Sequence, residues 1–190
     1  CEEVAALPRW YLDLVSGLGA VILGHAHPEV DEAVSTQLQW GVSFPLPTRL
    51  EHEVAERLLS LLTWPGAEMV RFGKNGADVT GIAVKLARAV TGKTRVYMNS
   101  YPGHAPWSVC RPPKDGGVTD YERAHSLHPN DGWTLESALA HGDIAAVIIE
   151  AVPSTKTETP EPDYFQHVRR LCDQYGALLI LDEMVTGFRC

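Results

Sequence analysis

The stretch Ile144-Ala145-Ala146-Val147-Ile148-Ile149-Glu150-Ala151-Val152 decides the fold class of this chain. An uninterrupted apolar run rich in β-branched residues is typical of a strand covered on both faces, as in a parallel sheet. Residues 177–181 form a second such run, and between the two lies a helical segment, residues 163–175, that ends at Gly176. Strand, helix and strand in this order predict a βαβ unit, and with it an α/β fold.

Both predicted strands end at an acidic residue, Glu150 in the first and Asp182 in the second. The carboxyl ends of parallel strands share one edge of the sheet, and ligands of open α/β folds bind at that edge. A carboxylate that ends a buried strand is costly unless it has a partner, so it suits a ligand cation or a metal ion. The sequence therefore predicts a ligand site at this edge.

Helical signals precede these strands. Pro28 opens one helical stretch, because a missing N–H is harmless in the first turn, and Gly41 closes it. Thr48 and Glu51 form a capping box, in which the two side chains satisfy free N–H groups at the start of a second helix. Residues 77–90 predict a third helix, with Lys85 and Arg88 outside its apolar face. That apolar face is predicted to consist of Val79, Ile82, Ala83, Leu86 and Val90.

The remaining segments are shorter. Residues 68–72 and 95–98 predict two short strands, and residues 135–141 predict a helix that Gly142 ends. Residues 102–131 are rich in Pro, Gly and Asp and predict a long loop, which in a compact domain is usually functional or mobile.

Composition and charge argue against several classes of protein. The 190 residues are 45% hydrophobic and 21% charged, which is typical of a globular domain, and the net charge of -8 disfavours nucleic acid or an anionic membrane as partner. No apolar stretch approaches the length of a membrane span. The cysteines show no metal-binding or disulfide spacing, so we expect no metal site and a cytoplasmic location. They are Cys1, Cys110, Cys172 and Cys190.

A nucleotide-triphosphate site is a weaker alternative. Gly92-Lys93-Thr94 matches the end of a P-loop, but position 87, where the earlier glycine belongs, is Ala87. Asp182-Glu183 after an apolar run resembles the acidic end of a Walker B strand, yet no complete P-loop accompanies it. A P-loop or metal enzyme therefore stays a minor alternative.

The segment Phe72-Gly73-Lys74-Asn75-Gly76-Ala77-Asp78 joins the predicted strand at 68–72 to a long helix. Its backbone N–H groups at Gly76 and Ala77 would point outward at the positive end of the helix dipole, which suits an anion and phosphate above all. A plain strand-to-helix turn that needs glycine for its backbone angles explains the segment equally well.

Four motifs in this order resemble those of the class III aminotransferases, particularly the branch similar to glutamate-1-semialdehyde aminomutase. They are Ile22-Leu23-Gly24-His25-Ala26-His27-Pro28, Gly73 to Asp78, Tyr101-Pro102-Gly103-His104, and Leu181-Asp182-Glu183-Met184-Val185-Thr186-Gly187-Phe188-Arg189. The resemblance implies fold type I, a mostly parallel sheet flanked by helices, with pyridoxal 5'-phosphate (PLP) as cofactor. It also implies a homodimer whose two subunits share the active site.

By matching position, the resemblance gives Asp182 the role of pairing with the pyridine N–H⁺, which keeps the ring protonated and electron-withdrawing. Tyr101 and Met184 would pack on the two faces of the ring, and Gly19 and Ser43 would lie on the substrate side. The full cofactor-binding set that it implies is Gly76, Ala77, Tyr101, Glu150, Asp182 and Met184.

The chain departs from the family at Asn75-Gly76-Ala77-Asp78, where Ser-Gly-Thr-Glu is usual, so a Thr hydroxyl at the phosphate turn is lost. No lysine matches the family's Schiff-base lysine, which we expect beyond Cys190. We therefore expect an N-terminal fragment that is inactive alone, with residues 1–45 contributing to a small domain and residues 46–190 forming part of the PLP-binding large domain.

The resemblance implies, for the full-length protein, PLP-dependent amino-group transfer to or from a small aldehyde or keto substrate. Two alternatives stay open. One is intramolecular 1,2-amino transfer of the glutamate-1-semialdehyde type, and the other is a non-catalytic domain with the PLP fold. The five lysines present are Lys74, Lys85, Lys93, Lys114 and Lys156.

Overall fold

The structure, a computed structural model, describes residues 11–64, 66–99, 101, 103–108, 124–128, 130–153 and 160–189. The chain divides into two compact units, Cys1–Val70 and Arg71–Cys190. The sequence predicts a different division, with residues 1–45 contributing to a small domain and residues 46–190 forming part of the PLP-binding large domain. That division stays a prediction.

The first unit contains two helices, α1 (Pro28–Trp40) and α2 (Arg49–Leu61). Both begin as predicted, α1 with proline in its first turn and α2 with its capping box. In that box the Thr48 hydroxyl accepts the Glu51 N–H at 3.3 Å, and the Glu51 carboxylate accepts the Thr48 N–H at 2.6 Å. No residue of either helix is buried, so their apolar side chains remain open to further packing.

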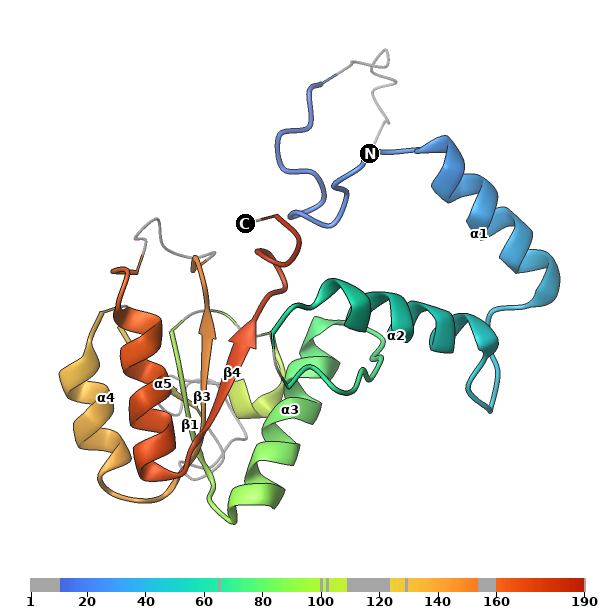
Figure 1. The fold of residues 1–190 in the computed structure, drawn as a ribbon. Helices are drawn as coiled ribbons and strands as arrows, with labels where there is room; N and C mark the ends of the chain where they lie inside the picture. Colours follow the sequence, from blue (N-terminus) through green and yellow to red (C-terminus); the bar gives the residue numbers. More distant parts are fainter. Residues whose placement is uncertain are drawn as a thin grey trace, which may run out of the picture. The chain divides into compact units, whose positions relative to one another are not determined.

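A parallel sheet forms the centre of the second unit (Figure 1). Among the described residues its strands, in spatial order, are β2 (Ala124–Ser126), β1 (Arg95–Met98), β3 (Ile144–Glu150) and β4 (Leu178–Asp182). Each strand is parallel to its neighbours. The predicted α/β class is therefore confirmed. The strands predicted at 95–98, 144–152 and 177–181 are confirmed too, and they span residues 95–98, 144–150 and 178–182.

Helices cover both faces of this sheet. Figure 1 shows α3 (Gly76–Thr91) on one side, and α4 (Gly132–Leu139) with α5 (Tyr164–Tyr175) on the other. α5 connects β3 to β4, which completes the predicted βαβ unit. α4 begins three residues earlier than predicted, because Asp131 caps it by accepting the Thr134 N–H at 2.9 Å.

The two faces of the sheet carry separate apolar cores. Val147 and Ile149 of β3 pack with α4 and α5, whereas Ala146 and Ile148 pack with α3. All four are at most 2% exposed. A strand that alternates between two buried faces must be apolar throughout, which explains the run that predicted it.

Two predictions about strands and loops were wrong. Residues 68–72 form no strand, because no neighbouring strand is hydrogen-bonded to them. The predicted loop over residues 102–131 contains the 3₁₀ turn Pro106–Ser108 and strand β2. β2 has only three residues and includes a histidine, so it carries no apolar signal. Residues 109–123 of that loop lie outside the described residues.

The helix predicted over residues 77–90 is confirmed, but its predicted apolar face is not the face that packs on the sheet. The residues that α3 buries are Thr80, Val84 and Ala87. The predicted stripe is apolar but exposed, by 39% to 66%, at Val79, Ile82, Leu86 and Val90.

Lys93 ties the loop after α3 to the distant end of α5. Its Nζ donates hydrogen bonds to the carbonyl oxygens of Tyr175 at 2.6 Å and of Gly176 at 3.0 Å. These carbonyls belong to the C-terminal end of α5, where the helix dipole favours a cation. The lysine of the P-loop-like sequence therefore has a structural role.

We expect Lys93→Met to lower the free energy of unfolding by about 1–2 kcal/mol, since the substitution keeps the apolar stem but leaves two carbonyls without their charged donor. Chemical denaturation of the whole protein measures the change. Lys85→Met is the matched control, because Lys85 is exposed on α3, and should change stability by less than about 0.5 kcal/mol. Equal effects of the two substitutions would show that the hydrogen bonds from Lys93 to Tyr175 and Gly176 do not stabilise the fold.

Candidate functional site

The acidic ends of β3 and β4 lie next to each other. Glu150 and Asp182 are direct partners in the parallel register, so their side chains point to the same face of the sheet. That face is the one covered by α3, because Ile148 and Ile180, two residues earlier in each strand, pack in the α3 core. Glu150 is 3% exposed and Asp182 is 7% exposed.

The surroundings of Asp182 disfavour its negative charge. Burial raises the pKa of this carboxyl above the usual aspartate range, and the nearby Glu150 raises the pKa further. The Met184 N–H, which donates to Asp182 Oδ1 at 3.0 Å, lowers the pKa and so opposes part of this effect. In the described part of the chain no Lys, Arg or His forms an ion pair with Asp182. The site is therefore suited to a cationic group of a ligand.

The N-terminus of α3 offers backbone donors. Asn75 caps the helix and its Oδ1 accepts the Asp78 N–H at 2.9 Å, while its carbonyl accepts the Val79 N–H at 3.1 Å. Within the described residues the amides of Gly76 and Ala77 have no hydrogen-bond acceptor. Asn75 thus serves as the N-cap of α3, and the N–H groups of Gly76 and Ala77 stay available for an anion.

This helix end lies against the segment that follows β4. A Cβ added at Gly76 would be 2.7 Å from Cε of Met184, so the glycine allows the two segments to approach closely. The predicted phosphate turn and the predicted ring-binding strand are therefore neighbours, as the sequence required.

The loop that carries Tyr101 packs on the same helix end. Gly103 has φ +109°, and a Cβ added there would lie 2.9 Å from Cβ and 3.0 Å from Cα of Ala77. Ser108 Oγ holds the loop by donating to the Gly103 carbonyl at 3.0 Å. The Tyr101 side chain is 58% exposed and open to a ligand. Gly103 was missing from the predicted site residues, although it stands inside the quoted motif.

The two acids of Asp182-Glu183 have different roles. Asp182 is buried at the strand end, whereas Glu183 is exposed and its carboxylate accepts the Thr186 hydroxyl at 3.2 Å. Glu183 therefore supports the turn after β4, and only Asp182 faces the site.

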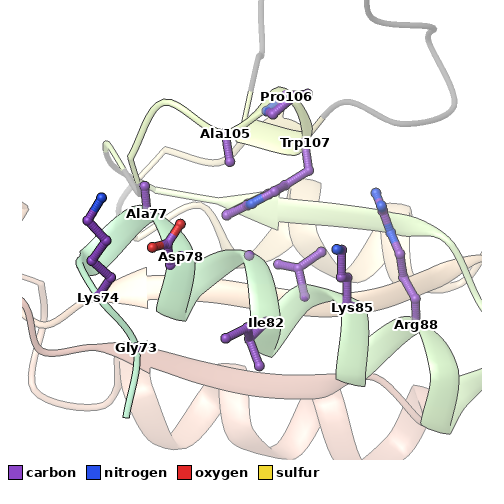
Figure 2. Close-up of a pocket in the computed structure, with 12 residues that line it drawn as sticks. Gly73, Lys74, Ala77, Asp78, Ile82, Lys85, Arg88, Ala105, Pro106 and Trp107 are labelled. Carbon is purple, nitrogen blue, oxygen red and sulfur yellow. The ribbon is translucent and has the colours of Figure 1, made fainter. Parts of the chain in front are cut away.

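A cavity of about 610 Å³ lies beside α3 (Figure 2). Its lining includes Gly73 and Ala77 of the turn, but none of the acidic or ring-contacting residues of the predicted site. Figure 2 shows Trp107 above α3 and Lys85 projecting from that helix. The cavity therefore borders the predicted phosphate turn but does not connect it to Asp182.

Gly19 and Ser43, expected on the substrate side, belong to the first unit. Ser43 lines a cavity of about 390 Å³ there, together with Gln37 and Phe44. Their roles, and those of the cofactor-binding set, stay predictions. What the structure brings together at one sheet edge is Gly76, Ala77, Glu150, Asp182 and Met184.

Fold and site together define a parallel α/β domain in which a buried carboxylate ends a strand, and a helix with N-terminal amides unpaired among the described residues lies against the segment that follows that strand. The family model described as "Aminotransferase class-III" matches residues 8–190. The chain therefore belongs to the class III aminotransferase family.

A relative in Heliobacterium modesticaldum, named glutamate-1-semialdehyde 2,1-aminomutase, is 37% identical over 94% of this chain and 44% of its own length. The chain thus spans less than half the length of this relative. Among solved structures, a glutamate-1-semialdehyde aminomutase from Pseudomonas aeruginosa PAO1 has a TM-score of 0.82 and 27% identity, over 91% of this chain and 41% of that one. A transaminase described as having PLP bound has a TM-score of 0.78 and 29% identity, over 89% and 43%.

Proposed function

We propose that the whole protein is a PLP-dependent enzyme that transfers an amino group to or from a small aldehyde or keto substrate. The observation that carries the proposal is that Met184 connects the two predicted contacts. Its N–H donates to the buried Asp182 carboxylate at 3.0 Å, and its Cε would lie 2.7 Å from a Cβ at Gly76, at the start of α3. Membership of the class III family and likeness to a transaminase with bound PLP support it.

The residues at this edge fit the chemical groups of PLP. The amides of Gly76 and Ala77 suit its phosphate, because a helix N-terminus stabilises a negative charge. Asp182, whose pKa is raised by burial, gains a counter-charge when it meets the protonated ring nitrogen. Tyr101 and Met184 supply an aromatic ring and a thioether for the faces of the planar cofactor.

When bound, PLP supplies an electron-withdrawing ring that makes proton loss from an amine-bearing carbon feasible. Asp182 holds the proton on the ring nitrogen, and its buried position excludes water that would weaken the pairing. Glu150 adds a second negative charge on the same face of the sheet. The family resemblance implies that a lysine would hold the cofactor covalently.

Intramolecular amino transfer is a second candidate, because a relative 37% identical to this chain is a glutamate-1-semialdehyde 2,1-aminomutase. The two functions differ in their need for a second substrate. A transaminase requires a separate amino acceptor, whereas an aminomutase converts glutamate-1-semialdehyde with no added acceptor.

We expect the whole protein to bind PLP, and to bind pyridoxal at least about tenfold more weakly, because pyridoxal lacks the phosphate that the α3 amides hold. Titration followed by PLP absorbance measures both affinities. Amine consumption is then assayed with and without a keto acid, and with glutamate-1-semialdehyde alone. Absence of PLP binding would refute the proposal and favour a non-catalytic domain.

We also propose that the enzyme is a cytoplasmic homodimer. The exposed apolar stripe on α3 supports an interface, since soluble proteins rarely leave such stripes uncovered. The buried free thiol of Cys172 supports a reducing compartment. Among the described residues, no helix is both long and apolar enough to cross a bilayer.

A further inference from the structure

Asn99, the residue directly after β1, makes three hydrogen bonds to β3. Its backbone N–H donates to the Ile148 carbonyl at 3.3 Å, which continues the sheet ladder. Its side chain then reaches Glu150: Nδ2 donates to the Glu150 carbonyl at 3.2 Å, and Oδ1 accepts the Glu150 N–H at 3.0 Å. The carboxamide therefore takes the place that the backbone of a further β1 residue would occupy.

The Asn99 side chain is needed because β1 ends before β3 does. β1 ends at Met98, and the chain then turns toward Tyr101 and toward Gly103, which contacts Ala77. The chain can leave the sheet at this point because Asn99 keeps the last residue of β3 paired. Without it, the buried N–H and C=O of Glu150 would lose their partners, at about 1–3 kcal/mol for each group.

The bonds from Asn99 also determine where Glu150 lies. Asn99 is 3% exposed, and its two side-chain bonds hold both main-chain polar groups of Glu150 on the β1 side. On the other side Glu150 is the register partner of Asp182. A shift of the Glu150 main chain would therefore change the separation of the two carboxylates.

We propose that Asn99 is a positioning residue of the cofactor site: its carboxamide holds the main chain of Glu150, and so keeps the Glu150 carboxylate beside Asp182. The inference rests on the proposed function, in which Asp182 pairs with the cofactor's ring nitrogen and Glu150 adds a second negative charge beside Asp182. Asn99 does not touch the cofactor in this arrangement; it acts through Glu150.

The test uses the whole protein with Asn99→Leu, which is similar in size but cannot bond to Glu150. In the cofactor-free protein, hydrogen exchange at the Glu150 amide should become at least about tenfold faster. The dissociation constant for PLP should rise at least about tenfold. Asn99→Asp keeps an acceptor for the Glu150 N–H but loses the donor to the Glu150 carbonyl. Exchange at the Glu150 amide in this variant should therefore be faster than in the unsubstituted protein and slower than in Asn99→Leu.

Lys93→Met is the matched control, because it weakens the same unit at the end of α5 without touching Glu150. It should leave the PLP dissociation constant unchanged, and any faster exchange should be the same at Glu150 as at Ile148 of the same strand, whereas Asn99→Leu should affect Glu150 most. An equal rise in the PLP dissociation constant for Lys93→Met and Asn99→Leu would overturn the proposal, since general loss of stability would explain both.

Should Asn99→Leu fail to fold, Asn99→Asp decides: unchanged exchange at Glu150 together with unchanged PLP affinity would overturn the proposal. Failure of the unsubstituted protein to bind PLP refutes the proposed function instead. In that case, hydrogen exchange in the cofactor-free protein still tests whether Asn99 holds Glu150. Failure of the proposed function and failure of the positioning role are therefore distinguishable.

Discussion

Asp182→Asn in the whole protein lowers the rate of amino transfer by at least about a hundredfold, while PLP still binds through its phosphate. A neutral amide cannot hold the proton on the ring nitrogen, and a full charge in a desolvated site is worth several kcal/mol, with each 1.36 kcal/mol changing a rate about tenfold. Steady-state kinetics at saturating PLP measures the loss. Near-normal turnover would refute the assignment of Asp182 to the ring nitrogen.

The same substitution should stabilise the cofactor-free protein at neutral pH. The pKa of Asp182 is raised in the folded state above the usual 3.8, so folded protein binds this proton more tightly than the unfolded chain does. Stability therefore falls as the pH rises from the unfolded pKa through the folded one, and stays lower above it. Asp182→Asn removes that loss.

The gain from Asp182→Asn should accordingly vanish below the unfolded pKa, where both states carry the proton. Denaturation of the cofactor-free proteins across a pH series checks this sign. A variant that gains stability but loses turnover would identify Asp182 as a functional residue maintained at a cost in stability. Loss of stability at neutral pH would contradict the burial argument.

Gly103→Ala should lower the free energy of unfolding by about 2 kcal/mol and weaken PLP binding at least about tenfold. A side chain at φ +109° is strained, and its Cβ would lie 3.0 Å from the backbone of Ala77 at the proposed phosphate site. The loop must therefore move away from the start of α3, or push that helix end out of place. Chemical denaturation and PLP titration measure the two effects.

Gly81→Ala is the matched control within the same unit. Gly81 lies inside α3, where a Cβ would be 3.6 Å from the Trp107 Nε1, an ordinary contact. Because alanine favours helix over glycine, this substitution should stabilise by up to about 1 kcal/mol and leave PLP affinity unchanged. Equal losses of PLP affinity in the two variants would show that the contact between Gly103 and Ala77 is not specific.

Local signals predicted most of the second unit and the start of each helix in the first. The apolar run at 144–150 and the pattern of 177–181 predicted buried parallel strands, because alternation between two covered faces leaves no polar position. The capping box at Thr48 predicted the start of α2, since its two hydrogen bonds join residues only three apart. The strand predicted over 68–72 failed because a strand also needs a neighbour, which a local pattern does not reveal.

The candidate site divides in the same way. Its acidic strand ends and its turn before α3 follow from the order of elements along the chain, since parallel strands bring their carboxyl ends to one edge. The contacts of Asn99 with Glu150 and of Gly103 with Ala77 join residues far apart in sequence and have no local pattern. Gly103 stands in a family motif but was not predicted to contact the site, and no sequence pattern predicted a role for Asn99.

The sequence by itself determined the α/β class, the helix caps and the set of chemical groups available at the sheet edge, because these depend on residue type and short spacing. Only the tertiary structure decided which face of α3 is buried: Ala87 is 1% exposed, whereas Leu86, its neighbour in the chain, is 60% exposed. It also decided that Asp182 rather than Glu183 faces the site. Burial and charge depend on what packs against a residue, and distant parts of the chain provide that packing.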